Sequence, residues 1–281
     1  MAQQKYNILP INDPSDSYFI EHDLFNLPAR VLIVGRSQVS GKTTLLINLL
    51  ARFYKEHFAP EDIWVISKTV NQEKMKKIVD YLQIPEDNLY NKFEPKILEA
   101  IYEGIKEEFK KDKLDGETPT HKLFIFDDMA YSNIFSSSAS HTDNIMDELF
   151  CNSRHYLVTV IVIAQKYTQI STTLRENASA LVIFESSSKQ LELIADDHAT
   201  TDKKTFMQEA KKATKKKHDF LFISYSNKTG NRFHHNFDTP IMNQEIAPPD
   251  NHQEIAPIDM RVDELPKKKS KKKKKLSQLT S

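Results

Sequence analysis

Three adjacent residues, Gly41, Lys42 and Thr43, have the types and the order that bind a polyphosphate. A triphosphate needs converging backbone N–H donors, close approach without an intervening side chain, and a helix N-terminus facing its charge. Gly41 permits the close approach, Lys42 is long enough to reach the β- and γ-phosphates, and the Thr43 hydroxyl can ligate Mg²⁺. Glycine is scarce here, with five in the whole chain. These residues predict a phosphate-binding loop (Walker A motif) for a nucleoside triphosphate.

The predicted loop joins an apolar run at 31–34 to an amphipathic stretch that begins at Lys42. The usual motif places four residues between its glycines, but five separate Gly35 from Gly41. Either Arg36 takes the position of the first glycine or the loop bulges by one residue. The residues expected to contact the nucleotide are Gly35, Ser37, Gln38, Val39, Ser40, Gly41, Lys42, Thr43 and Thr44.

Two adjacent carboxylates, Asp127 and Asp128, follow the apolar residues 123–126. Asp127, at the strand tip, can hold the Mg²⁺ shell together with Thr43, and Asp128 can polarise the attacking water. Apolar strands often end in aspartate at turns, but downstream of a phosphate loop the pair is the expected partner motif (Walker B). Aspartate in the second position reaches less far than glutamate. The adjacent acids favour an NTPase that does mechanical work over a nucleotide kinase.

Three polar residues downstream of these carboxylates are further candidates for the site. Gln165 ends an apolar run and either senses the γ-phosphate or caps a strand. Arg154 and Arg175 each fit two roles, namely an arginine finger in a neighbouring subunit or a surface salt-bridge partner.

Short apolar runs alternate with longer amphipathic stretches, which predicts an α/β fold with a mostly parallel central sheet flanked by helices. The predicted strands are rich in Val, Ile, Leu and Phe, as expected for strands covered on both faces; they span 30–34, 63–67, 122–127, 156–164, 180–184 and 219–225. The predicted helices span 42–57, 72–82, 95–111, 143–155, 189–195 and 203–216, and 231–237 extends the last strand into a hairpin. Residues 112–120 and 131–141 are expected as surface loops.

The composition limits the class of protein. The longest apolar runs, 160–164 and 180–184, are much shorter than the roughly 18 residues of a membrane helix, so no membrane segment is expected. A single cysteine, Cys151, excludes an internal disulfide framework and favours a reducing compartment. The chain has 39 basic and 39 acidic residues, but eight of the basic ones are lysines at 267–275. Without that segment the rest of the chain has a net charge of about −8.

We expect four regions: an N-terminal extension at 1–27, the nucleotide-binding domain at 28–238, a linker rich in proline and acids at 239–266, and a lysine-rich tail at 267–281. The linker contains the sequence QEIAP twice and is expected to be disordered or a docking peptide. The tail can bind phosphates without sequence preference, act as a nuclear-localisation signal, or aid solubility.

Four segments in this order resemble the genome-packaging ATPases of large double-stranded DNA viruses: GRSQVSGKTTLL, LFIFDDM, LFCNSRHYLVTVIVIAQKY and LRENAS. The resemblance is to the poxvirus type, with relatives in virophages and polinton-like elements, within the FtsK/HerA superfamily. It covers roughly residues 28–238. It implies a RecA-like P-loop NTPase fold, a ring of five or six subunits, and ATP with Mg²⁺ as cofactors.

The resemblance also implies residue roles. Lys42 and Thr43 match the phosphate and Mg²⁺ ligands, Asp127 the metal-coordinating acid, and Asp128 the water-activating acid. Gln165 then matches the strand-end sensor and Arg154 the trans-acting arginine, while Arg175 has an interface or sensor role.

The first hypothesis is therefore an ATP-driven translocase that packages double-stranded DNA into a preformed capsid, with a capsid portal or vertex protein as partner. It would work inside the host cell, in a viral factory of the cytoplasm or nucleus, or with the virion. The loop 131–141 and the basic segment 211–217 are candidate DNA contacts. The alternatives are a helicase or small-molecule phosphotransferase, and a nucleotide-gated DNA-binding adaptor that hydrolyses slowly.

Overall fold

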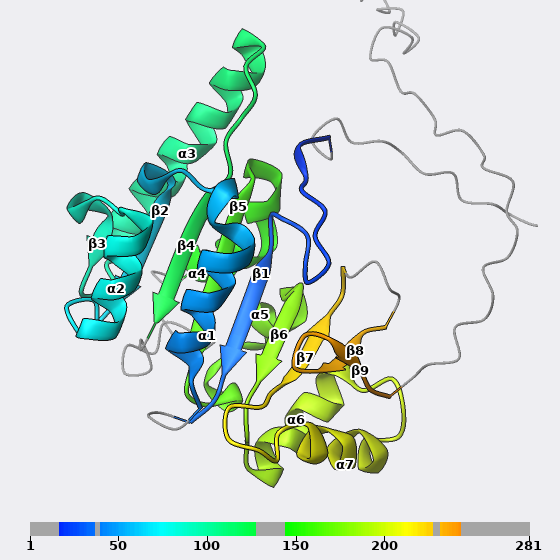
Figure 1. Ribbon diagram of the computed structural model, residues 1–281. Helices are drawn as coiled ribbons and strands as arrows, with labels where there is room; N and C mark the ends of the chain where they lie inside the picture. Colours follow the sequence, from blue (N-terminus) through cyan, green and yellow to red (C-terminus); the bar gives the residue numbers. More distant parts are fainter. Residues whose placement is uncertain (1–16, 37–39, 128–143, 227–230, 243–281) are drawn as a thin grey trace, which may run out of the picture. The chain divides into compact units, whose positions relative to one another are not determined.

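Nine strands form a single sheet in the computed structural model, which describes residues 17–36, 40–127, 144–226 and 231–242. The spatial order is β3-β2-β4-β5-β1-β6-β7-β8-β9 (Figure 1). The six strands from β3 to β6 are parallel, and β7, β8 and β9 continue the sheet in antiparallel pairs. Their bounds are β1 Arg30–Val34, β2 Ile63–Ser67, β3 Leu89–Tyr90, β4 Lys122–Asp127, β5 Val158–Ala164, β6 Ala180–Ile183, β7 Leu221–Ser224, β8 Phe233–His235 and β9 Thr239–Pro240.

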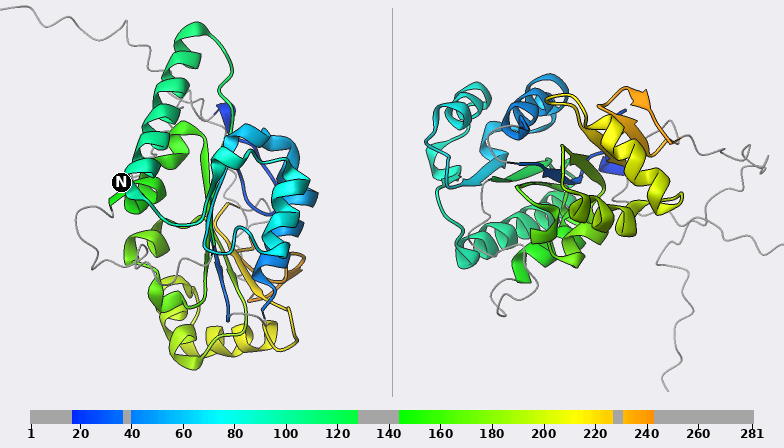
Figure 2. Two further views of the ribbon diagram at one scale, coloured as in Figure 1. Left: turned by 90° about the vertical axis from the view of Figure 1, so that its left-hand side faces the viewer. Right: turned by 90° about the horizontal axis from the view of Figure 1, so that it is seen from below.

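Helices cover both faces of the sheet, which is why its central strands are apolar on both sides. Every residue of β4 and β5 is buried. Seen along the sheet in Figure 2, α1 (Lys42–Leu49) and α2 (Glu73–Leu82) lie on one face. The opposite face carries α3 Pro95–Asp115, α4 Asn144–Asn152, α5 Thr172–Asn177, α6 Ser188–His198 and α7 Lys203–Ala213. Two hydrophobic cores result, one on each side of the sheet.

The strand register brings the carboxyl ends of β2, β4, β5 and β1 to the same edge. Asp127, the last residue of β4, lies beside Ser67 of β2 and Ile163 of β5. Val34, the last residue of β1, lies beside Ala164. Because β5 lies between β4 and β1, the residue that follows β5 stands between the ends of the other two strands.

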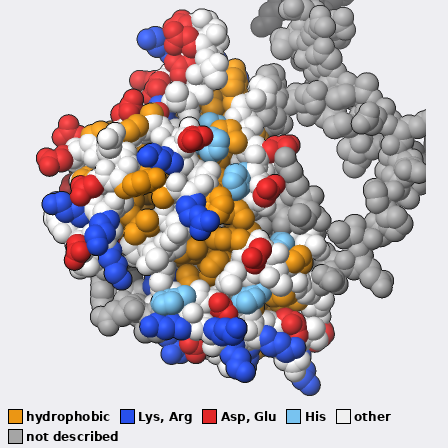
Figure 3. Space-filling model, viewed as in Figure 1, with side chains coloured by type: hydrophobic (Ala, Val, Ile, Leu, Met, Phe, Trp, Pro, Cys, Tyr) orange, Lys and Arg blue, Asp and Glu red, His pale blue; other side chains and the backbone are white. Residues whose placement is uncertain are grey.

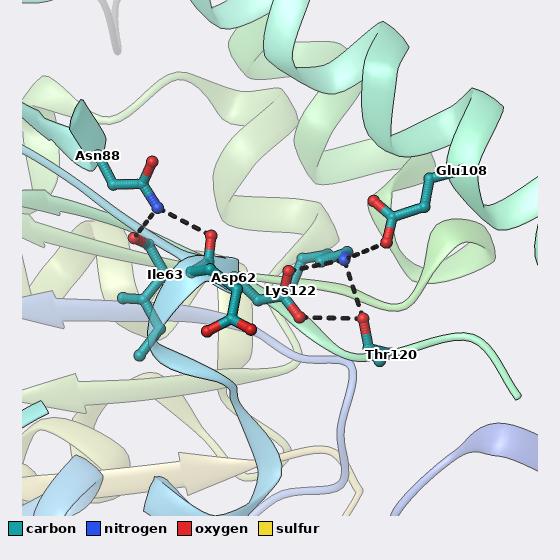
Figure 4. Close-up of polar contacts among 7 residues, drawn as sticks. Asp62, Ile63, Asn88, Glu108, Thr120 and Lys122 are labelled. Atoms are coloured by element: carbon teal, nitrogen blue, oxygen red, sulfur yellow. Dashed lines mark hydrogen bonds and ion pairs between the residues drawn. The ribbon is translucent and has the colours of Figure 1, made fainter. Parts of the chain in front are cut away.

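The opposite edge of the sheet is fixed by a buried lysine. The Lys122 ammonium group donates to Asp62 Oδ1 at 2.7 Å, to Glu108 Oε1 at 2.8 Å and to Thr120 Oγ1 at 2.8 Å (Figure 4). Burial acts to lower the pKa of Lys122, but the hydrogen bonds that Lys122 donates to both carboxylates outweigh it and raise the pKa. Since Glu108 belongs to α3, this cluster ties that helix to the starts of β2 and β4.

The sequence analysis predicted this fold class correctly, and the strands at 30–34, 63–67 and 122–127 have the expected bounds. Helix α3 is longer than predicted, because it runs through Asp115 into the expected loop and ends where Gly116 adopts a left-handed conformation with φ 74°. Helix α7 is shorter, ending at Ala213. The short helix α5 was not predicted; the Ser171 hydroxyl caps it by accepting from Leu174 N–H at 3.3 Å. None of the helices that the structure describes is long and apolar enough to cross a membrane.

Part of the expected N-terminal extension packs on the nucleotide-binding domain. Ile20 and Leu27 form a β-bridge, and Leu24, Phe25 and Leu27 are buried in the core on the α1 side. Strand β9 lies just beyond the expected boundary at 238, and pairs with β8. The linker from residue 243 on, the lysine-rich tail and the predicted loop at 131–141 lie outside the described residues.

Candidate nucleotide-binding site

Both glycines of the predicted phosphate loop are required by their surroundings, for different reasons. Gly35 N–H donates to Ala164 O at 3.2 Å, and a Cβ atom at Gly35 would lie 2.8 Å from Phe184 Cβ. Gly41 has φ 86° and precedes the first turn of α1. Position 35 therefore needs glycine for packing, and position 41 needs it for its left-handed backbone.

Lys42 begins α1, and its ammonium group is held over the loop by backbone carbonyls. Lys42 Nζ donates to Gly35 O at 2.6 Å, to Arg36 O at 3.0 Å and to Ser40 Oγ at 3.4 Å. Ser40 Oγ in turn donates to Arg36 O at 2.8 Å. The helix N-terminus and the lysine thus present positive charge on the same side of the loop.

A cavity of about 550 Å³ lies at this edge of the sheet and is lined by seven of the predicted residues, including Ser40, Gly41 and Thr44 of the phosphate loop and α1. Lys42 and Thr43 line it from α1, Asp127 from the end of β4, and Gln165 from the position after β5. The Asp127 side chain is buried, and both Asp127 and Thr43 offer the hard oxygen atoms that Mg²⁺ prefers. The residues present therefore fit a triphosphate with Mg²⁺.

The connection between β2 and α2 also lines this cavity, through Thr69 and Gln72, as does the first turn of α2, through Glu73 and Lys74. The sequence analysis missed these residues because no local motif marks them; they reach the site through the position of β2 beside β4. The Glu73 carboxylate is hydrogen-bonded to Lys77, which lowers its pKa, so it is ionised at neutral pH.

A second cavity, of about 750 Å³, adjoins the first on the outer side of α1. Figure 3 shows it as the hollow lined by hydrophobic side chains in the centre of the view, between α1 and the β7–β8 hairpin. Its apolar walls are Leu24, Leu45, Phe53, Phe184, Phe220 and Phe237. Four residues line both cavities: Ser40, Gly41, Thr44 and His218. His218 was not predicted, and no sequence pattern marks it.

The two candidate arginines lie in different environments, both away from the cavity. Arg154 is exposed and precedes β5, so it lies at the amino end of that strand, about 20 Å from the phosphate edge at 3.3 Å per residue. Arg175 forms an ion pair with Asp197, and its guanidinium lies 5.3 Å from the centre of the Tyr167 ring. Arg175 is therefore held within its own chain.

The Arg175–Asp197 pair belongs to a buried polar network around His198. Tyr167 Oη lies 2.8 Å from Asp197 Oδ2 and 2.7 Å from His198 Nε2, and His198 Nδ1 lies 2.6 Å from Tyr225 Oη. If the Tyr167 hydroxyl donates to Asp197, it accepts from His198 Nε2–H, and Tyr225 donates to Nδ1. Burial lowers the pKa of His198 to about 4, so a neutral ring satisfies every partner.

Four predicted site residues, Ser37, Gln38, Val39 and Asp128, lie outside the described residues. Within the described part of the chain there is no group of three or more His, Cys, Asp or Glu side chains that could hold a metal ion. A Mg²⁺ site built from one carboxylate, one hydroxyl and phosphate oxygens is consistent with that finding.

Comparisons with known proteins agree with this architecture. The family model for the Poxvirus A32 protein matches residues 16–240. Among solved structures, the genome packaging NTPase B204 of Sulfolobus turreted icosahedral virus 2 in complex with sulfate is 16% identical, covering 78% of this chain and 100% of that chain, with a TM-score of 0.50. At that identity the likeness shows the fold alone.

Two further solved structures are similar to this chain with lower TM-scores. The conjugation coupling protein TcpA of pCW3, solved with ATPgS, is 14% identical over 80% of this chain and 68% of that chain, with a TM-score of 0.49. The cytoplasmic domain of the type VII secretion ATPase EccC of Thermomonospora curvata is 14% identical over 80% of this chain and 27% of that chain, with a TM-score of 0.47. No curated protein sequence matches the chain significantly.

Proposed function

This chain belongs to the Poxvirus A32 protein family, and we propose that it is an ATPase that drives double-stranded DNA into a preformed viral capsid. The observation that carries the proposal is the insertion of β5 between β1 and β4. It puts Gln165 between the phosphate loop and Asp127, with all three on one cavity. A strand-tip amide in that position can report on the γ-phosphate, as a motor needs.

In this proposal the triphosphate lies in the 550 Å³ cavity, and the base lies in the adjoining apolar cavity. Lys42 leaves the loop carbonyls for the β- and γ-phosphates, so its hydrogen bonds to neutral carbonyl oxygens are replaced by hydrogen bonds to anionic phosphate oxygens. Thr43 and Asp127 would hold Mg²⁺, which neutralises charge on the phosphate oxygens during transfer. Asp128 would orient the attacking water, and Gln165 would fix the position of that water relative to the γ-phosphate.

The proposed DNA contact is the basic segment that follows and includes the end of α7. Its five lysines, Lys211, Lys212, Lys215, Lys216 and Lys217, are all exposed. Figure 3 shows Lys and Arg side chains gathered over α7, beside the nucleotide edge of the sheet. Because DNA binding through phosphates releases counterions, we expect affinity to fall steeply as salt concentration rises. The ring of five or six subunits, the capsid portal or vertex partner and the location in a viral factory are further parts of the proposal.

The test is the steady-state ATPase rate with Mg²⁺, measured without DNA, with single strands and with duplex DNA, at low and moderate salt. We expect turnover in the wild type, stimulation by duplex DNA above that by single strands, and a loss of at least about 100-fold in Lys42→Ala. Lys92→Ala is the matched lysine control, because Lys92 is exposed and its ion pair with Glu94 lies away from the cavity.

The outcomes separate the competing functions. Stimulation by single strands above duplex favours a helicase, and turnover indifferent to both forms of DNA contradicts the motor for the isolated chain. DNA binding with nucleotide binding but negligible turnover favours the adaptor.

A further inference from the structure

Four residues mark the passage between the two cavities, and three of them belong to the phosphate loop and α1. The fourth, His218, comes from the connection between α7 and β7, far along the chain. A nucleotide with its phosphates in one cavity and its base in the other must cross this passage with its sugar. His218 therefore lies where the sugar of the nucleotide is expected.

The His218 backbone is held in an unfavourable conformation. Its φ of 73° is in the left-handed region, which costs a non-glycine residue on the order of 1 kcal/mol and persists only when neighbours enforce it. The next residue, Asp219, is anchored to the β8 hairpin by His235 Nε2 at 3.0 Å, and Phe220 N–H donates to Asn236 Oδ1 at 3.2 Å. These contacts hold the connection so that the imidazole lies against the phosphate loop.

The imidazole is in close contact with the loop on one side and exposed on the other. A Cβ atom at Gly41 would lie 2.9 Å from His218 Nδ1, so the ring lies directly beside this glycine. His218 Nδ1 lies 3.4 Å from Ser40 O, a carbonyl that only accepts. Among the residues that the structure describes, none forms a hydrogen bond with His218 Nε2. A neutral ring with its proton on Nδ1 presents a lone pair at Nε2.

We propose that His218 is a nucleotide-binding residue that accepts a hydrogen bond from a ribose hydroxyl through Nε2. Phosphate oxygens only accept, so they do not suit that lone pair, whereas sugar hydroxyls donate. His218 thus makes the site selective for a nucleotide over an inorganic polyphosphate. The inference rests on the proposed function, since it needs the nucleotide to bind across the two cavities.

The experiment uses the full chain and equilibrium titration calorimetry with three probes: ADP, 2′,3′-dideoxy-ADP and inorganic triphosphate. The variant is His218→Asn, because asparagine tolerates a left-handed backbone and so preserves the connection while removing the ring. We expect the Kd of ADP to rise about 5-fold, the loss of one neutral hydrogen bond. The Kd values of dideoxy-ADP and inorganic triphosphate should not change, since neither has a ribose hydroxyl.

His155→Asn, the same substitution at an exposed histidine on the other edge of the sheet, is the matched control and should bind all three probes as the wild type does. His218→Gly, which relieves the left-handed strain, must show the same selective loss if the ring rather than the backbone is responsible. An unchanged ADP affinity in both variants, or equal losses for ADP and dideoxy-ADP, overturns the assignment of His218. Absence of ADP and triphosphate binding in the wild type overturns the proposed function itself.

Discussion

At the scale of single residues, the stability of the fold depends on groups whose charge state is set by their surroundings. His198 shows this most directly, because two tyrosine hydroxyls bind its ring nitrogens in a buried position. The neutral ring fits that network, whereas burial disfavours the protonated ring and so lowers the pKa of His198. The carboxylate of Asp197 is occupied by Arg175 and Tyr167. This part of the molecule is therefore expected to lose stability in acid.

The pH dependence of stability tests this view. In the unfolded chain a histidine binds a proton below about pH 6.5, whereas in the folded chain His198 does so only near a pKa of about 4. The stabilisation is thus fully present above about pH 6.5 and is lost as the pH falls towards about 4, on the order of 3 kcal/mol in total. The measurement is urea unfolding at several pH values between 4 and 7.

Buried His121 and His234, whose pKa values are also lowered, titrate in both proteins, so the comparison between wild type and His198→Gln isolates His198. Glutamine can bind both tyrosine hydroxyls and does not titrate in this range. We expect a flatter dependence in the variant. Parallel curves for the two proteins would contradict a neutral buried His198.

At the scale of elements, the sheet edge opposite the nucleotide is held by the Lys122 cluster. The Lys122 side chain is 6% exposed and the Asp62 side chain 11%, so this ion pair is removed from water. A buried ion pair stabilises a protein little more than apolar residues of the same size would. Removing one partner is costly, however, because it leaves the other charge buried without a counter-charge. The two ion pairs of Lys122, with Asp62 and with Glu108, therefore matter chiefly for how β2, β4 and α3 fit together.

We expect Lys122→Met to lower the free energy of unfolding by about 3 kcal/mol, because Asp62 is left as a buried carboxylate without its cation. Lys77→Met removes a lysine from an i,i+4 pair with Glu73 in which the side chains are 67% and 84% exposed, and should destabilise the protein far less than Lys122→Met. Urea unfolding at neutral pH measures both. Equal losses of unfolding free energy in the two variants would show that the cluster behaves as a surface pair. The double variant Lys122→Met with Asp62→Leu should recover part of the stability lost in Lys122→Met, because no buried carboxylate is left at position 62.

At the scale of the whole molecule, one arginine is placed where it cannot act on its own nucleotide. The length of β5 separates Arg154 from the phosphate edge of the same chain. Arg175 is bound to Asp197 inside its own chain, so of the two candidates Arg154 is the better placed for a neighbouring subunit. The trans-acting arginine stays a prediction, and it requires a ring in which each site is shared.

Complementation between inactive variants tests that requirement. Lys42→Ala lacks the phosphate lysine and Arg154→Ala lacks the finger, so each should be inactive alone, the latter by about 1,000-fold. In an equal mixture, a subunit with Lys42 lies next to a subunit with Arg154 at about a quarter of the interfaces. The ATPase rate of the mixture should therefore recover to about a quarter of the wild-type rate. The double variant mixed with Lys42→Ala is the control and should stay inactive. No recovery in the first mixture, despite subunit exchange, would contradict a shared site.

The sequence by itself determined the local parts of this protein: the phosphate loop, the strand that ends at Asp127 and the α/β class. Those features arise from neighbours in the chain, such as glycine beside lysine before a helix, or four apolar residues before an acid. The helix ends were less predictable because they depend on single conformations, as at Gly116.

Only the tertiary structure decided which distant residues meet. The order of the strands puts Gln165 between the phosphate loop and Asp127, folds Arg175 onto Asp197, and brings His218 against Gly41. No local pattern carries that information, because strand order follows from the packing of all the strands and helices together, and the left-handed turn at His218 exists only where the β8 hairpin holds it.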